Sequence, residues 1–155
     1  MARMRIRWLN AYLPVLLWMS IIFIGSTDLG SSQRTSRIIG PILRFFKPDV
    51  TDETIRAVQL VVRKTGHVTV YAVLAALAWR GRKVAQGLKL KEGGWNWPEM
   101  WGIVAFCAVY AVTDELHQKF VSSRQASPVD VGFDTLGATC ALLMIYALGR
   151  WKKAW

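Results

Sequence analysis

Ionisable and amide side chains suited to ligand binding or proton transfer occur in two groups inside otherwise apolar stretches. The two groups comprise Lys64, His67, Tyr71, Asp114, Glu115 and Gln118. Side chains three or four residues apart share one face of a helix, so each group is predicted to point in one direction. Glu115 is turned by about 100° from Asp114 and lies beside that face. Together these residue types can supply a general base, a cation for an anionic group, and hydrogen bonds to a ligand.

The apolar segments beside these groups are too short to cross a membrane without them. The run from Val68 to Trp79 supplies only about half of the ~20 residues that a spanning helix needs, so the span must extend back through His67 and Lys64. The run from Trp101 to Thr113 has the same shortfall. Ionisable groups at membrane depth are costly and usually face a bundle interior or a wet cavity. We therefore predict a functional site at these positions.

Composition and charge indicate one polytopic membrane domain over residues 1–155. The chain is 53% hydrophobic with a formal net charge of +10. Such a charge suggests nucleic acid as the partner of a soluble protein, but here the Lys and Arg residues lie beside the apolar runs, which indicates membrane topology and lipid contact. No nucleic-acid partner is expected. Cys107 and Cys140 fall within predicted spans without metal-type spacing, and we predict neither a disulfide nor a zinc finger.

The predicted fold is all-α, a bundle of four transmembrane helices at roughly 8–25, 58–79, 99–120 and 129–149. The second helix is expected to begin near Thr51, capped by Asp49 or Thr51. The first span has the basic start and apolar core of an uncleaved signal anchor, and a cleavable signal peptide is the alternative. Residues 36–47 are expected either to lie in the outer membrane interface or to form an ordinary loop over the bundle.

The flanking cations predict that both termini are cytoplasmic. Under the four-span topology one side of the membrane receives Arg3, Arg5, Arg7, Arg80, Arg82, Lys83, Lys89, Lys91, Arg150, Lys152 and Lys153. An excess of Lys and Arg marks the cytoplasmic side, although the opposite loops also contain cations mixed with acidic residues. Most tryptophans map to the same side. The predicted location is the inner, or plasma, membrane, with the polar groups toward its outer leaflet.

The polar residues also have structural explanations, which stay open here. Lys64 could extend its ammonium to the outer head groups, and His67 could hydrogen-bond between helices. Asp114 and Glu115 are harder to explain in this way, because two adjacent carboxylates at the end of a span need partners. The nearest candidates for partners are Lys64 and Arg124. His117 is expected at the surface.

Asp130 also has a structural explanation. In Ser127-Pro128-Val129-Asp130 the serine can cap the fourth helix and the aspartate can complete a capping box. A metal site drawn from His67, Asp114, Glu115 and Asp130 is chemically conceivable, but no spacing resembles His-Glu-x-x-His. We predict no metal and no cofactor.

The polar positions occur in an ordered pattern that resembles the VanZ-like membrane protein family. The pattern is Arg63-Lys64-x-Gly66-His67-x-x-x-Tyr71-x-x-Leu74, then Asp114-Glu115-x-x-Gln118-x-x-x-x-x-Arg124-x-x-Ser127-x-x-Asp130, then Thr135-x-Gly137-Ala138. The resemblance covers the second to fourth spans. It implies that the site residues are Lys64, His67, Tyr71, Asp114, Glu115, Gln118, Arg124 and Asp130. The founding member of the family is associated with resistance to the glycopeptide antibiotic teicoplanin. One departure is Asp134, where the family pattern usually has asparagine.

Two functions fit these features, and whether the protein is an enzyme stays open. The first is a binding or protective module that recognises an amphiphilic cell-envelope ligand through Lys64, Arg124 and the carboxylates, with membrane lipid around its tail. The second is an enzyme acting on a lipid-linked envelope substrate, with His67 or Glu115 as general base and Asp114 orienting the histidine. A proton or ion path is disfavoured because the polar groups are confined to the outer half of the spans.

Overall fold

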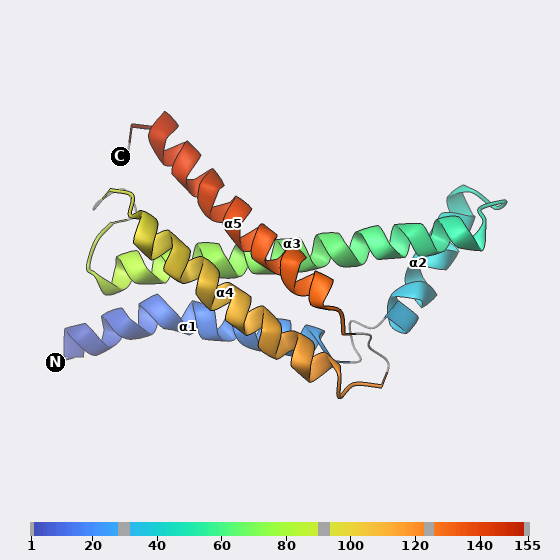
Figure 1. Ribbon diagram of the computed structural model, residues 1–155, viewed down its shortest axis with the longest axis horizontal. Coiled ribbons are helices and arrows are strands. Elements are labelled where there is room, and N and C mark those ends of the chain that lie inside the picture. The colour runs from blue at the N-terminus through green and yellow to red at the C-terminus, as the bar shows by residue number, and fades with distance from the viewer. Residues whose placement is uncertain (1, 28–31, 90–93, 123–125, 154–155) are drawn as a thin grey trace.

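The computed structural model describes residues 2–27, 32–89, 94–122 and 126–153, and within these residues the protein is entirely helical (Figure 1). The helices are α1 (Ala2–Gly25), α2 (Ser32–Phe46), α3 (Asp52–Ala85), α4 (Trp97–Gln118) and α5 (Pro128–Trp151). The all-α prediction is confirmed. The predicted count of four helices is not, because the segment between the first two spans forms α2.

α2 is an amphipathic helix of 15 residues that continues through Gly40 and Pro41. Its apolar residues recur at helical spacing, and Ile38, Ile42 and Phe45 are all exposed. The interpretation of this segment as an ordinary loop is therefore wrong. A helix with exposed apolar residues and cations between them has the composition of one that lies in a membrane interface.

Three helices are long and apolar enough to cross a membrane: α1 from Met4, α3 and α5. α4 is not among them in the part of the chain that the structure describes, although it contains 22 residues. Its first turn contains Glu99, and its last turns contain Asp114 and Glu115, which lower its mean hydropathy. The crossing of α4 therefore stays a prediction.

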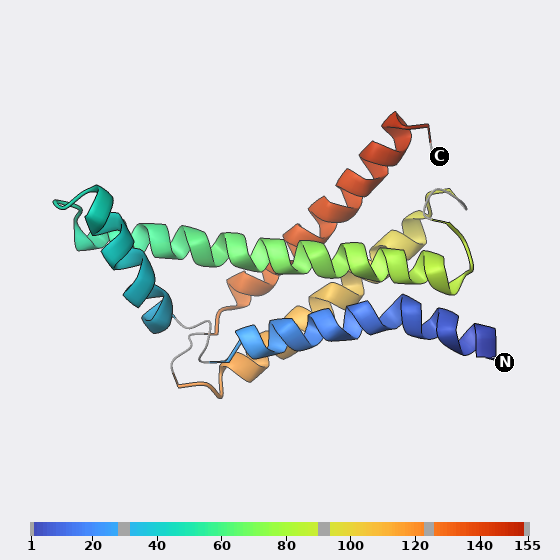
Figure 2. The same ribbon diagram turned by 180° about the vertical axis from the view of Figure 1, so that it is seen from behind.

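α3 is the central helix and contacts each of the other four (Figure 1). Its 34 residues extend over about 51 Å, well beyond the ~30 Å of a bilayer core. Its start near Thr51 is as predicted, since the Thr51 side chain accepts a hydrogen bond from the amide of Thr54. α1 runs beside the second half of α3, α4 and α5 cross α3 obliquely, and α2 packs against its first half (Figures 1 and 2).

The bundle has two ends that differ in chemistry. At the polar end, the last turns of α1 and α4 and the first turns of α5 lie beside the middle of α3. At the opposite end lie the starts of α1 and α4 and the ends of α3 and α5. The first turn of α1 and the last turn of α5 thus lie at the same end of the molecule.

Glycines allow two of the helix pairs to approach closely. A Cβ atom on Gly137 of α5 would lie 2.3 Å from the carbonyl oxygen of Val68 in α3. A Cβ atom on Gly81 of α3 would lie 2.7 Å from the carbonyl oxygen of Ala11 in α1. Any larger side chain would force the backbones apart, so these glycines fix the spacing of α3 to its two neighbours.

Hydrogen bonds between helices complete the packing around an apolar core. The Trp18 indole donates to the carbonyl of Val70 at 2.8 Å, and the Tyr110 hydroxyl donates to that of Met19 at 2.6 Å. Both bonds tie α1 to its neighbours. The largest completely buried apolar side chains are Tyr71, Leu74, Cys107, Met100 and Leu142.

Candidate functional site

A cluster of charged side chains from three helices lies at the polar end. It consists of Arg63, Lys64 and His67 of α3, Asp114 and Glu115 of α4, and Asp130 and Asp134 of α5, and is called the polar cluster below. The close approach of Gly137 to Val68 sets the register of α3 against α5. One turn before Gly137, Asp134 therefore meets His67, and one turn earlier again Asp130 meets Lys64.

Asp130 is completely buried and binds two cations. One of its carboxylate oxygens accepts a hydrogen bond from Arg63 at 2.8 Å, and the other accepts one from the ammonium of Lys64. The capping-box interpretation of Asp130 is wrong. Ser127 is the N-cap residue of α5, but its side chain makes no capping hydrogen bond within the described residues, and the aspartate faces α3 instead. The Ser127 amide that a capping box would use donates to Glu115 instead, and the buried Asp130 carboxylate is compensated by two cations.

His67 is held by Asp134. The Nδ1 atom of His67 lies 3.0 Å from a carboxylate oxygen of Asp134, which is itself completely buried. This contact fixes the ring and leaves Nε2 as the free nitrogen. The hypothesis that Asp114 orients the histidine is therefore wrong. Asp134 and Arg63 were not among the predicted site residues. The four-residue interval between Asp130 and Asp134 was the signal for Asp134, because it places both on one face of α5.

Asp114 and Glu115 are both buried and find local partners. Glu115 accepts a hydrogen bond from the backbone amide of Ser127 at 2.7 Å, which ties α4 to the start of α5. Asp114 accepts one from the side chain of Gln118, also buried, at 3.2 Å. The expected partner Lys64 binds Asp130 instead. The other expected partner, Arg124, lies outside the described residues.

Several buried polar atoms at the polar end have no hydrogen-bond partner among the residues that the structure describes. They are one oxygen each of Asp114, Glu115 and Asp134, the hydroxyl of Tyr71, Nε of Arg63 and Nε2 of His117. Native proteins rarely leave buried polar atoms unpaired, and such atoms point to a bound water, ion or ligand. These side chains belong to three different helices, so a ligand held by them would bridge α3, α4 and α5.

The remaining histidine lies nearby but is not part of the polar cluster. His117 is half-buried, and its ring centroid lies 4.3 Å from that of Phe23 at the end of α1. The expectation that His117 is a surface residue is therefore only partly correct. Its contact with an aromatic ring indicates packing between α4 and α1.

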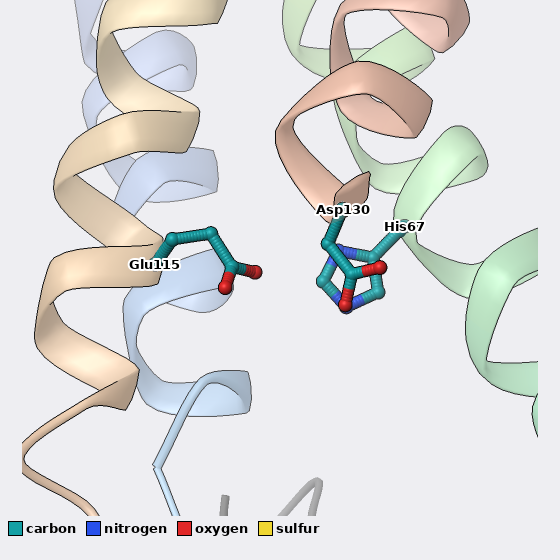
Figure 3. Close-up of side chains that lie close together, drawn as sticks. All are labelled: His67, Glu115 and Asp130. Carbon is teal, nitrogen blue, oxygen red and sulfur yellow. The ribbon is translucent and has the colours of Figure 1, made fainter. Parts of the chain in front are cut away.

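Three residues of the polar cluster could hold a metal ion. Ligand atoms of His67, Glu115 and Asp130 all lie within 4.8 Å of one another. Figure 3 shows the Glu115 side chain pointing from α4 toward Asp130 and the His67 ring. Each residue comes from a different helix, so the three converge only in the folded protein.

The fold and this cluster define a helical membrane protein with charged residues buried between its helices. The model of the VanZ/LLP1 family matches residues 11–149, nearly the whole chain. The chain therefore belongs to the VanZ/LLP1 family, as the ordered polar motifs predict. No curated protein and no solved structure matches it.

Proposed function

We propose that the protein is a multi-pass plasma-membrane protein that binds the polar head of an amphiphilic cell-envelope molecule in the polar cluster, at the outer leaflet. The observation that carries the proposal is the set of unpaired buried oxygens on Asp114, Glu115 and Asp134. Native proteins leave few buried polar atoms unpaired, so three such oxygens on neighbouring carboxylates indicate a bound group; the comparable oxygen of Glu99 at the opposite end has Arg82 as an ion-pair partner. The resemblance to a family whose founding member is associated with glycopeptide resistance supports a ligand of the cell envelope.

The chemistry of the cluster favours a head group rich in hydrogen-bond donors. Unpaired carboxylate oxygens accept hydrogen bonds from hydroxyl, amide or ammonium groups. Lys64 and one terminal nitrogen of Arg63 are already paired with Asp130, so an anionic group would have to compete for them, and among their buried nitrogens only Nε of Arg63 lacks a partner within the described residues. Recognition through the carboxylates is therefore better supported than the expected recognition through Lys64. The tail of the ligand would lie along the exposed apolar surface of the helices.

The topology belongs to this proposal. α4 would cross the membrane as a fourth span, and its exposed Phe106, Val109 and Val112 would face lipid. Both termini would then lie on one side of the membrane, because the first turn of α1 and the last turn of α5 lie at the same end of the molecule (Figure 1). The flanking Lys and Arg residues assign that side to the cytoplasm. Tryptophans gather at that same end, at Trp8, Trp97 and Trp151, as they do at a membrane interface.

A second candidate function is catalysis on a lipid-linked envelope substrate, and the contact between His67 and Asp134 favours it. A carboxylate that holds Nδ1 of a histidine fixes the tautomer and orients Nε2 to act as a general base. The reaction would proceed by attack of water. Cys107 is completely buried in the core and is not placed to act as a nucleophile.

Native mass spectrometry of the protein extracted in mild detergent from envelope-producing cells tests the binding proposal. The wild type should retain a bound amphiphile, and Asp114→Asn with Glu115→Gln should lose most of it. Glu99→Gln at the opposite end is the matched control and should retain it. Equal retention by the cluster variant and the wild type would contradict the proposal.

Profiling of envelope precursors separates binding from catalysis. If the protein is an enzyme, a deletion strain should accumulate one lipid-linked precursor, and His67→Ala should fail to clear it although it still binds the amphiphile. A deletion strain with an unchanged precursor profile would exclude the catalytic candidate and leave the binding module.

A further inference from the structure

The charges of the polar cluster do not balance. Four carboxylates lie together in the cluster, and the permanently cationic side chains among its described members are Arg63 and Lys64. With all four carboxylates ionised and His67 neutral, two negative charges have no counterpart among the described members of the cluster. Uncompensated charge is costly at membrane depth. One divalent cation would neutralise it.

The cluster also supplies the ligands that such an ion needs. Imidazole and carboxylate are both donor types that bind zinc and related first-row metals, and the cluster offers one imidazole and two carboxylates. Asp134 holds Nδ1 of His67 at 3.0 Å, so the free ligand atom is Nε2. A carboxylate behind a histidine is the usual support of a metal-binding imidazole.

The separations are close to those of a metal site. Ligand atoms around one ion at ~2.1 Å lie about 3.4 Å apart. One ligand atom of each residue lies within 4.8 Å of the others, so the widest pair would have to close by up to about 1.4 Å. Glu115 can make this movement because one of its oxygens has no partner within the described residues. That oxygen belongs to a side chain directed at the other two ligands (Figure 3).

The ammonium of Lys64 would have to give way at Asp130. It already lies 4.9 Å from the centroid of the Phe133 ring, and this attraction to the aromatic face would remain available to it after it leaves the carboxylate. Arg63 can remain on the other oxygen of Asp130.

We propose that His67, Glu115 and Asp130 bind one divalent transition-metal ion of the zinc class, with Asp134 positioning the histidine. This departs from the expectation of no metal, which rested on spacing within single helices. Three protein ligands leave a coordination position open for water or for a donor atom of the head group. The proposal deepens the proposed function by naming what would hold that head group, but metal binding itself does not require the envelope ligand.

The test is metal analysis of the full-length protein, purified with a tag that contains no histidine. After treatment with EDTA and addition of Zn²⁺, the wild type should bind about one equivalent per chain by elemental mass spectrometry. His67→Ala and Glu115→Gln should each lower the bound metal at least tenfold. The matched controls are His117→Ala and Glu99→Gln, which replace the same residue types outside the site and should bind as the wild type does.

Co²⁺ provides a readout that does not depend on stoichiometry. It should give visible absorption bands typical of nitrogen and oxygen ligands, and these bands should disappear in His67→Ala and persist in His117→Ala. Wild-type protein without bound metal, or equal binding by His67→Ala when circular dichroism shows it folded, would overturn the proposal. If metal binds but the amphiphile is not retained, the metal site stands and the proposed function fails.

Discussion

The two ends of the bundle both contain buried charge, but they satisfy it in different ways. At the opposite end, Lys83 is almost completely buried and donates to the carbonyl of Gly94 at 3.0 Å, and Arg80 donates to the carbonyl of Asn10 at 3.1 Å. Both cations satisfy backbone carbonyls of the chain itself, one in the loop before α4 and one within α1. At the polar end carboxylates predominate, and several of their oxygens have no partner in the described part of the chain.

The cationic side chains at the opposite end therefore stabilise the fold, whereas carboxylates of the polar cluster remain available to a ligand. The cations of the opposite end bind the chain's own carbonyls, so their role is complete in the folded protein. In the polar cluster Asp130 is paired with two cations, but Asp114, Glu115 and Asp134 each keep one oxygen without a hydrogen-bond partner within the described residues. Substitutions at the two ends should therefore have different consequences.

The largest expected effect is that of removing the carboxylate of Asp130. Asp130→Ala leaves the partly buried cations of Arg63 and Lys64 without their anion, and should lower the free energy of unfolding by about 4 kcal/mol. The matched change at the opposite end is Glu99→Ala, whose partner Arg82 is half exposed. Glu99→Ala should lower the free energy of unfolding by less than about 1 kcal/mol. Unfolding in SDS measures both, and equal losses would show that the two ends do not differ in this way.

The next effect should come from the contact that sets the register of the cluster. Gly137→Ala places a methyl group against the Val68 carbonyl and forces α3 and α5 apart, with an expected loss of about 2 kcal/mol. Gly132→Ala on the same helix meets nothing within 4 Å and serves as the control. In the same unfolding assay, a loss as small as that of Gly132→Ala would show that α3 and α5 do not depend on this close approach.

The smallest expected effect has the opposite sign. Asp134→Asn removes one negative charge from the carboxylate-rich cluster while the amide can still contact His67. In EDTA it should raise the free energy of unfolding by about 1 kcal/mol. Asp52→Asn changes an exposed carboxylate in the pair with Arg44 and serves as the control. A destabilised Asp134→Asn variant in EDTA would mean that the cluster is not short of positive charge.

The sequence was sufficient to predict the elements but not how they pack. The apolar runs gave the four long helices approximately, and Thr51 correctly marked the start of α3. In α2 the apolar residues at helical spacing favour a helix, whereas Gly40 and Pro41 favour a break. The helix continues through both residues. Local sequence does not show that a proline can be tolerated within an amphipathic helix.

Pairing across helices was the part that the sequence could not supply. Helical spacing places Lys64 and His67 on one face of α3, but the rotation of α5 against that face depends on the contact between Gly137 and Val68. That rotation decides that Asp130 binds Lys64 and that Asp134 holds His67. The local capping pattern around Ser127 favoured a different role for Asp130, because a pattern within one helix cannot include a cation on another.

The central claim is that the polar cluster opens to the outer side of the plasma membrane. The direct test is cysteine labelling in intact cells with a membrane-impermeant maleimide, after Cys107 and Cys140 are replaced by alanine. Ser122 lies exposed beyond the end of α4 at the polar end, and Lys152 lies exposed beyond the end of α5 at the opposite end. We predict that Ser122→Cys is labelled in intact cells and Lys152→Cys only after permeabilisation; the reverse result would contradict the account.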